Sequence, residues 1–245
     1  MTMMPAQKLE ILGCPCLAFR EKEAVGLLLS IVDSAEPGYC VAINAGKIWA
    51  YSKNIDLKDI INQAKLPYPD GSGAVLGLKW LYGVDSEKIN MPVKALEAAN
   101  QRCLRTFIIG ARESVHDLAI KEIKSRYQKI NLVGHMHGYH PKKTIAEKVR
   151  STRPNLILIA MGSPKQEIFA AELIAECQYG LAIGCGGALD IMAGKVKRAP
   201  KFLVDNNLEW LYRLFKQPWR LPRQFFLPLF FLKLLLAVFR KKVGK

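Results

Sequence analysis

Several patterns that would assign a chain to a common class are missing from this sequence. It contains neither a G-x-G-x-x-G run nor a P-loop, so dinucleotide-dependent oxidoreductases and P-loop NTPases lose their main support. The amino terminus lacks the basic-then-apolar pattern of a secretory signal, so we expect the six cysteines to be reduced cytosolic thiols. No internal repeat or low-complexity linker occurs. With 245 residues, 50% of them hydrophobic, the chain can bury a full core.

Candidate metal ligands are present but poorly spaced. Cys14-x-Cys16 has no matching second half of a zinc site, and we interpret it as two small residues of an early strand. His135-x-His137-x-x-His140 fits neither two ligands one helical turn apart nor a zinc-finger pair, and no acidic ligand is adjacent. We therefore predict no metal site, and a histidine loop packed near the rim of an active site.

Acidic residues are scarce, and the excess of basic over acidic residues is concentrated in one part of the chain. The net charge is +15, from 36 Lys and Arg against 21 Asp and Glu. From Lys195 to Lys245 there are 13 basic residues and only two acidic ones, so this part alone carries +11. A basic surface this broad attracts polyanions such as nucleic acid, anionic lipid or phosphorylated substrates. Charge alone does not choose among them.

The alternation of apolar and amphipathic runs after residue 105 predicts a parallel sheet with crossover helices. The expected strands are Thr106–Ile109, Ile130–Val133, Leu156–Ala160 and Leu181–Ile183. The expected helices are Glu113–Tyr127, Lys142–Ser151 and Pro164–Cys177. Earlier in the chain we expect the strands Leu9–Leu12 and Cys40–Ile43 and the helices Glu21–Val32 and Leu57–Ala64. The sequence therefore indicates an α/β fold.

Three turns rich in small residues follow expected strands. They contain Gly110, then Gly162, and finally the segment from Gly184 to Asp190. Ligands of open α/β sheets bind at the carboxyl edge of the strands. Because all three turns would lie at that edge, together they favour a nucleotide pocket more than any one of them does.

The turn at Gly162 has the residues of a helix start. Ser163 suits the N-cap, Pro164 the first helical position, and Gln166 the partner of a capping box. Free N–H groups and the positive end of the helix dipole would favour a phosphate or diphosphate there. Ordinary helix capping explains the same residues, so both interpretations stay open.

Asp70 is the carboxylate that could carry chemistry. It lies in Pro69-Asp70-Gly71-Ser72-Gly73, a turn between two apolar segments. Asp-Gly is first of all turn chemistry. A general base needs such a carboxylate held beside its substrate with the charge intact, and nothing local decides between the two roles.

The last part of the chain combines apolar and basic residues. Helical spacing runs from Leu208 to Phe215, and Pro218 is then expected to interrupt the helix. From Phe225 to Phe239 the only residues that are not apolar are Pro228 and Lys233. As a helix this run would reach roughly 22 Å, short of the ~30 Å hydrocarbon core, so we expect it to lie in the membrane interface. The basic residues that flank it are Arg220, Arg223, Arg240, Lys241, Lys242 and Lys245. A core helix or a dimer contact is the alternative.

Several motifs occur in a fixed order along the chain. They are Asn44-Ala45-x-Lys47, Pro69-Asp70-Gly71, Met161 to Glu167, Gly186 to Asp190, Gly194-x-Val196-x-Arg198-Ala199-Pro200, and Leu208 to Leu214. In this order and spacing they resemble the WecG/TagA/CpsF family of glycosyltransferases, over about Leu9 to Arg223.

The resemblance implies a Rossmann-like α/β fold, with a mostly parallel sheet flanked by helices and a basic helical C-terminal appendage. Residues 1–104 would form an N-terminal part with the catalytic aspartate, residues 105–194 the nucleotide-sugar-binding part, and residues 195–245 the membrane-associating appendage. The implied reaction is an inverting, metal-independent transfer from a UDP-sugar to an undecaprenyl-diphosphate-linked acceptor, in bacterial surface polysaccharide synthesis. The transferred sugar would be N-acetylmannosamine, N-acetylmannosaminuronic acid or a hexose. No cofactor is implied, and the enzyme is expected in the cytoplasm, bound to the inner face of the cell membrane.

The resemblance also implies roles for single residues. Asp70 would be the base that deprotonates the acceptor hydroxyl, and Asn44 would position substrate. Gln166 and the Gly162–Ser163 turn would contact the donor, while Asp190 would lie on the nucleotide or be structural. Arginine forks suit diphosphate oxygens, although Arg213 could instead be a solvent-facing helix charge. The expected substrate-binding residues are Asn44, Lys88, Gly110, Gly162, Ser163, Gln166, Gly187, Asp190, Arg213, Arg220 and Arg223.

The chain departs from the family pattern at three single positions and in one turn, where Asn90-Met91-Pro92-Val93 replaces a turn of small residues. Ala42 stands where members commonly have Thr, Gly46 where they have Glu, and Lys88 where they have Arg. Lysine cannot reproduce a bidentate guanidinium fork, so the identity of the donor and the level of activity stay open. These departures favour one alternative, a catalytically impaired scaffold attached to the membrane.

A basic nucleic-acid-binding protein is the other alternative. It would need basic residues interleaved with aromatics on an exposed sheet or groove. Here the basic tail flanks an apolar run instead, which favours lipid, so we expect no nucleic-acid partner. Whether the chain forms a homo-oligomer stays open.

Overall fold

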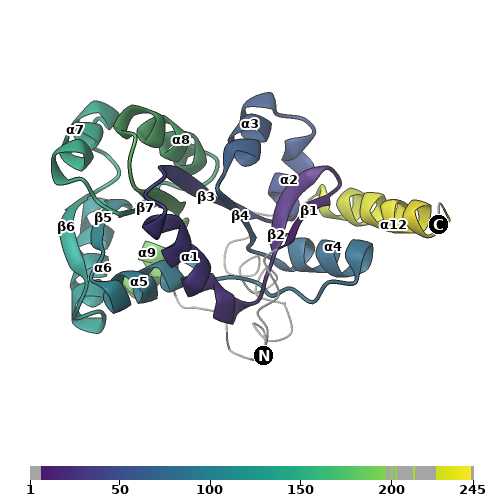
Figure 1. Ribbon diagram of the computed structural model, residues 1–245, viewed down its shortest axis with the longest axis horizontal. Coiled ribbons are helices and arrows are strands. Elements are labelled where there is room, and N and C mark those ends of the chain that lie inside the picture. The colour runs from purple at the N-terminus through teal and green to yellow at the C-terminus, as the bar shows by residue number, and fades with distance from the viewer. Residues whose placement is uncertain (1–6, 197–199, 201, 203–211, 213–224, 244–245) are drawn as a thin grey trace.

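A parallel sheet of six strands forms the centre of the molecule (Figure 1). The computed structural model describes residues 7–196, 200, 202, 212 and 225–243. The sheet has the strand order β4-β3-β8-β7-β5-β6, and β1 and β2 form a separate antiparallel pair. The strands are β1 (Gln7–Ile11), β2 (Cys14–Ala18), β3 (Gly38–Ile43), β4 (Leu66–Pro69), β5 (Arg105–Gly110), β6 (Asn131–Met136), β7 (Leu156–Ala160) and β8 (Leu181–Gly184).

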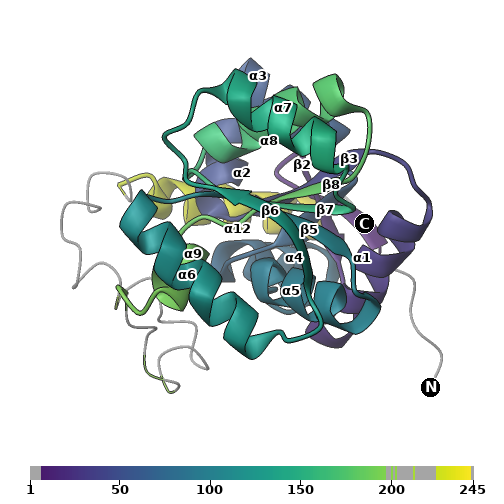
Figure 2. The same ribbon diagram turned by 90° about the vertical axis from the view of Figure 1, so that its left-hand side faces the viewer.

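Helices cover both faces of the sheet (Figure 2). On one face lie α2 (Ala45–Tyr51), α3 (Ile55–Gln63), α7 (Lys142–Thr152) and α8 (Lys165–Cys177). On the other lie α1 (Ala24–Asp33), preceded by the 3-10 turn η1 (Glu21–Glu23), α5 (Met91–Arg102), α6 (Glu113–Arg126) and α9 (Ala188–Met192). Each face has its own apolar core, as a buried parallel sheet requires. The expected Rossmann-like α/β fold is confirmed.

The strands and helices expected after residue 105 are present with bounds that differ by a few residues at most. In the earlier part the expected strands and helices also form, but α2, α5, β4 and α4 (Ser72–Tyr82) had no counterpart among the expected elements. Two asparagines start helices here, because Asn44 and Asn54 each accept a hydrogen bond from the backbone N–H three residues later. Gly83, with φ of +69°, ends α4.

β4 is an edge strand made of Leu-Pro-Tyr-Pro. It pairs in parallel with β3, so that Val41 is opposite Pro67 and Ile43 is opposite Pro69. Proline has no N–H to give to a ladder, and edge strands tolerate it because one side of the strand has no sheet partner. Beyond this edge lie β2, which packs against β4, and then α4 and α12 (Leu227–Val243) (Figure 1).

The apolar run near the C-terminus forms α12, which packs on α4 and α2. Phe230 and Leu234 are completely buried, and Phe226 stacks on Trp49 with 5.9 Å between ring centroids. Pro228 stands at the second helical position, where its missing N–H removes no helical hydrogen bond. Among the described residues, no helix is long and apolar enough to cross a membrane. The helix expected from Leu208 to Phe215 falls outside them, apart from Tyr212.

Replacing phenylalanine by alanine is expected to destabilise the protein strongly on the buried face of α12 and hardly at all on the exposed face. Phe230→Ala removes a fully buried ring and is expected to lower the free energy of unfolding by about 3–5 kcal/mol. Phe239→Ala removes the same ring where it is 68% exposed, and the change is expected to stay within about 0.5 kcal/mol. Urea denaturation of both variants measures the difference. Equal losses would contradict the packing of α12 described here.

Candidate functional site

The loops that follow the sheet strands meet at one edge, because all six strands run in the same direction. Along this edge the strand order places Asp70, Asn44, Gly187, Gly162 and Gly110 one after another. With neighbouring strands about 4.8 Å apart, Asp70 and Gly162 follow strands separated by roughly 14 Å. The turns that the sequence pattern assigned to a common edge do share it, and Asp70 lies on that same edge.

Several helices begin at this edge, and two neighbouring connections leave it toward opposite faces of the sheet. The helices α4, α6 and α8 begin there, so their free N–H groups and dipoles favour an anion. The chain leaves β3 toward α2 on one face and leaves β8 toward α9 on the other (Figure 2). Such a point, where adjacent connections diverge, is where open α/β sheets bind ligands.

Asn44 and Asp70 are neighbours at the ends of two paired strands. The Asp70 N–H donates to the Ile43 carbonyl at 2.9 Å, which continues the β3–β4 ladder into the turn. A Cβ built on Gly71 would lie 3.3 Å from the Cβ of Asn44, so the two turns are in close contact. Asn44 accepts from the Lys47 N–H at 3.1 Å and thereby caps α2. The half-buried Asp70 side chain is therefore held beside the start of α2.

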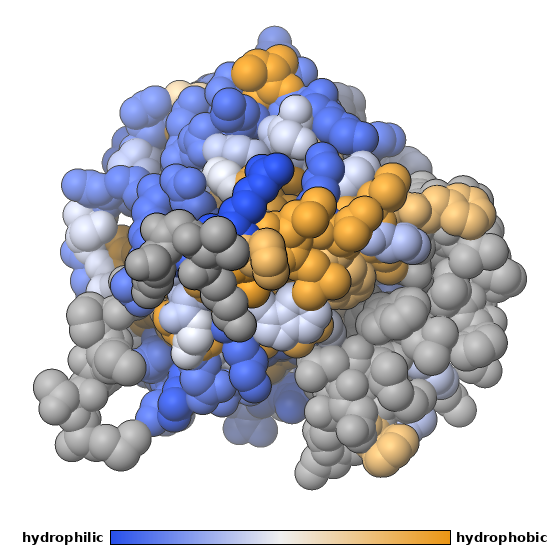
Figure 3. Space-filling model, turned by 90° about the vertical axis from the view of Figure 1, so that its right-hand side faces the viewer, coloured by the Kyte–Doolittle hydropathy of each residue, from blue (hydrophilic) through white to orange (hydrophobic). Residues whose placement is uncertain are grey.

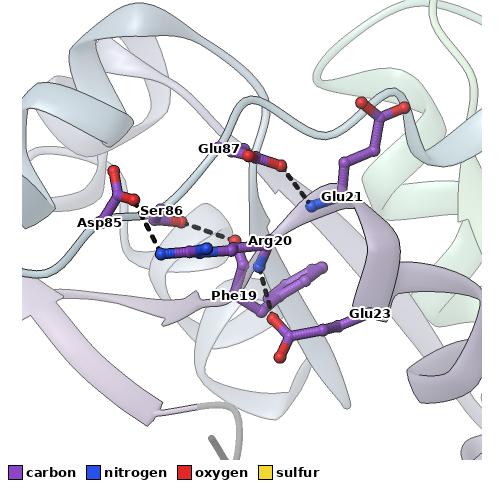
Figure 4. Close-up of polar contacts among 7 residues, drawn as sticks. All are labelled: Phe19, Arg20, Glu21, Glu23, Asp85, Ser86 and Glu87. Carbon is purple, nitrogen blue, oxygen red and sulfur yellow. Dashed lines mark hydrogen bonds and ion pairs between the residues drawn. The ribbon is translucent and has the colours of Figure 1, made fainter. Parts of the chain in front are cut away.

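The segment that carries Lys88 is clamped to the chain after β2 (Figure 4). Three hydrogen bonds with a side-chain partner join the segments: Arg20 Nη2 to Asp85 Oδ2 (3.0 Å), Ser86 Oγ to the Phe19 carbonyl (3.0 Å), and the Glu21 N–H to Glu87 Oε2 (2.7 Å). The Glu87 N–H also donates to the Phe19 carbonyl at 3.3 Å. Ser86 is buried. Three of these four bonds involve a backbone group, so the clamp fixes the path of the loop as well as its side chains.

The clamp places Lys88 near the end of β4. The Ile89 N–H donates to the Pro69 carbonyl at 2.8 Å, one residue before Asp70. Lys88 immediately precedes Ile89 and is half-buried. The structure thus brings Lys88 to the part of the edge where Asn44 and Asp70 lie.

The expected capping of α8 is wrong. Pro164 is the N-cap, the helix begins at Lys165, and no side chain caps it. Gln166 does not fold back to form a capping box, because its side chain points across the edge of the sheet. Its Oε1 accepts from the Gly186 N–H at 2.9 Å, and its Nε2 donates to Glu167 Oε1 at 3.1 Å. With 4% exposure, Gln166 therefore fixes two turns of the site relative to each other.

A buried ion pair lies behind these turns, and the sequence reasoning missed it. Lys47 Nζ is 3.0 Å from Glu167 Oε1, and the side chains are 7% and 2% exposed. Glu167 Oε2 has no hydrogen-bond partner among the described residues. The sequence did contain a signal for this pair. Lys47 and Glu167 each belong to one of the motifs shared with the family, and each lies in the first turn of a helix that packs on the sheet.

Gly110 and Asp190 lie on the same edge in different settings. Gly110 has φ of +121°, and a Cβ there would be 2.2 Å from the Ala160 carbonyl oxygen, so no other residue fits. Asp190, in α9, accepts hydrogen bonds from Lys195 and Val196 through its backbone carbonyl. Ser163 lies at the exposed turn before α8. The three expected arginines, Arg213, Arg220 and Arg223, lie outside the described residues.

The histidine loop lies against the Gly110 turn, and a fourth histidine joins it. The Gly138 N–H donates to the Ala111 carbonyl at 2.9 Å. His116, which the sequence reasoning overlooked, is buried and donates from Nδ1 to the Gly110 carbonyl at 2.9 Å. Its Nε2 accepts from His135 Nδ1 at 3.0 Å. Burial, followed for His116 by the nearby His135, lowers the pKa of both imidazoles.

The two cysteines of Cys14-x-Cys16 are free thiols in β2. Cys14 and Cys16 are buried in β2 without a disulfide, and burial raises the pKa of Cys14 to about 12. Both act as small apolar residues of an early strand, as expected. In the described part of the chain, no group of three or more His, Cys, Asp or Glu residues could hold a metal ion.

Comparisons with known proteins relate most of this chain to one family. A profile of the glycosyl transferase WecG/TagA/CpsF family matches residues 9–244. The chain belongs to this family. It is therefore a glycosyltransferase. A relative from Bacillus subtilis (strain 168), named N-acetylglucosaminyldiphosphoundecaprenol N-acetyl-beta-D-mannosaminyltransferase, is 30% identical over 227 residues, covering 88% of this chain and 89% of the relative. Family membership agrees with the resemblance carried by the motifs.

The lowered pKa values of His116 and His135 lead us to predict how the stability of this glycosyltransferase depends on pH. Because both pKa values are lowered on folding, the unfolded chain takes up protons first as the pH falls below about 6.5. The free energy of unfolding is therefore expected to decrease from about pH 7 to pH 5.5. His116→Gln should decrease less over the same interval, measured by urea denaturation at each pH. Identical slopes would show that the pair does not titrate in this way.

Proposed function

We propose that this glycosyltransferase moves a sugar from a UDP-sugar to the hydroxyl of an undecaprenyl-diphosphate-linked acceptor, with Asp70 as the base. The observation that carries the proposal is that Asp70 and Asn44 lie side by side on the edge that also holds the Gly162 and Gly187 turns. The activity for which the Bacillus subtilis relative is named supports the lipid-linked diphosphate acceptor. It also supports N-acetylmannosamine as the first sugar to test.

In this proposal the donor and the acceptor bind at different strands of the sheet. Residues 105–194 hold the donor, with its diphosphate near the start of α8 and the Gly162 turn. The N-terminal part holds the acceptor sugar near Asn44 and Asp70. Between them the acceptor oxygen forms a bond to the anomeric carbon while the bond from that carbon to UDP breaks. Asp70 takes the hydroxyl proton, and attack opposite the leaving group inverts the configuration.

The negative charge that develops on UDP needs nearby cations, since the proposed mechanism uses no divalent metal. Helix N-termini supply part of the compensating positive charge. Lys88 is held close to the Asp70 end of the edge and can supply more. We assign the remainder to Arg213, Arg220 and Arg223, whose planar forks suit diphosphate oxygens. Lys88 provides a single point charge where the family pattern has a fork, so its effect on donor choice is part of the proposal.

We further propose that α12 holds the site against the inner face of the cell membrane. Opposite its buried face, the helix exposes large apolar side chains, and apolar residues gather at that end of the molecule (Figure 3). The exposed residues are Leu229, Leu232, Leu235, Leu236 and Phe239, each 50–68% exposed. Exposed Arg240 and Lys241 follow them. Such an arrangement suits an amphipathic helix in an anionic interface.

The contacts of α12 explain how membrane attachment would serve catalysis. Phe230 lies near Gly73 at the start of α4, and Phe226 lies near Gly46 in α2. α4 begins two residues after Asp70, and α2 begins one residue after Asn44. A membrane-bound α12 would therefore bring the base close to a lipid-linked acceptor.

Asp70→Asn tests the proposed chemistry. Loss of the proton acceptor is expected to lower kcat about 10²- to 10⁴-fold while the thermal unfolding midpoint changes little. UDP-N-acetylmannosamine and related UDP-sugars would be incubated with a short-chain lipid-diphosphate-linked N-acetylglucosamine, and product read by mass spectrometry. Asp59→Asn, an exposed carboxylate on α3, is the matched control and should keep full activity. Unimpaired transfer by Asp70→Asn would remove Asp70 from the mechanism.

Flotation with anionic vesicles tests the role of α12. Leu232→Glu combined with Leu236→Glu removes apolar contact area and adds repulsion, so vesicle binding should fall at least about tenfold. Ile55→Glu with Leu118→Glu changes two exposed apolar residues on other helices and should leave binding unchanged. Equal binding by wild type and the α12 variant would exclude this helix as the attachment site.

A further inference from the structure

The buried Lys47–Glu167 pair is part of a continuous chain of hydrogen bonds across the site. Asn44 Oδ1 accepts from the Lys47 N–H (3.1 Å), and Lys47 Nζ contacts Glu167 Oε1 (3.0 Å). The same Glu167 oxygen accepts from Gln166 Nε2 (3.1 Å), and Gln166 Oε1 accepts from the Gly186 N–H (2.9 Å). These hydrogen bonds thus join the loops that follow β3, β7 and β8.

The path of this link is built into the sheet edge. β8 lies between β3 and β7, and the Gln166 side chain crosses the carboxyl end of β8 to reach the Gly186 N–H. Gly184, the last residue of β8, leaves the necessary space, because a Cβ there would be 2.6 Å from Gln166 Nε2. The glycine is therefore needed for the side chain that crosses it.

Stability alone does not account for a charged pair at this position. Two charges lose their hydration on burial, and well-packed apolar residues of similar volume are often as stabilising or more so. Glu167 also keeps one buried oxygen without a partner among the described residues, which is a further cost. What the pair does supply is a fixed geometry between two helices that start at the site, because both its ends are anchored by additional hydrogen bonds.

We propose that Lys47 and Glu167 are positioning residues that hold the Asn44–Asp70 side of the site in register with the Gly162 and Gly186 turns. The inference rests on the proposed function, in which the first side holds the acceptor and the second the donor. Lys47 touches neither reacting group in this arrangement. It acts through Asn44, which it holds with its backbone N–H, while Glu167 acts through Gln166.

The experiment replaces the pair with apolar residues of similar size. Lys47→Met combined with Glu167→Met leaves no unpaired charge, so the variant should unfold at or above the wild-type urea midpoint. We expect kcat to fall about 10- to 100-fold with KM for the donor changed little, because small misplacements of reacting groups cost this much. Backbone amides of Lys47 and Gly186 should exchange hydrogen faster than in wild type. A purely structural pair would instead leave kcat and amide exchange unchanged, which would overturn the proposal.

Two further variants complete the test. Lys142→Met with Glu172→Met removes a surface ion pair that also involves α8, and should keep wild-type kcat and exchange. Gly184→Ala breaks the link without touching a charge, since its Cβ displaces Gln166, and should lower kcat even if the double Met variant does not fold. Full kcat in Gly184→Ala would also overturn the proposal. Absence of transfer by wild type would refute the proposed function. Amide exchange at Lys47 and Gly186 would still show whether the Lys47–Glu167 pair holds the two sides of the site together.

Discussion

The central strands carry no charged side chain, and this constraint determines where chemistry can occur. β3, β7 and β8 are buried on both faces by the two apolar cores. A parallel sheet of this kind places charged groups most readily in the loops beyond its buried strands. Asn44, Asp70 and Gln166 all lie in such loops or at the helix starts that follow, so the position of the candidate site is a consequence of how the sheet is buried.

The sequence predicted well those parts of the fold in which one apolar period dominates. β7 is a continuous apolar run and α6 is amphipathic, so local pattern and final structure agree. β4 was not recognised as a strand because two of its four residues are prolines, which only an edge position tolerates. The start of α8 was misassigned because Gln166 finds a tertiary partner, Gly186, that competes with local capping.

The sequence allows candidate site residues to be named one by one, but it does not give their arrangement. Asp70 and Asn44 are 26 residues apart in the chain, and only the β3–β4 register makes them neighbours. Lys47 and Glu167 belong to motifs that the sequence displays, yet their pairing depends on the strand order around β8. Spacing in the chain reveals contacts within one helix or hairpin, whereas contacts between distant loops follow from topology.

The proline content of β4 has a consequence for how the molecule meets other chains. An ordinary edge strand offers a row of N–H and C=O groups to which a foreign strand can add. β4 lacks two of its four N–H donors, and β2 packs against it. The sheet is thereby protected from extension at its β4 edge, so another chain cannot add a strand beside the one that ends at Asp70.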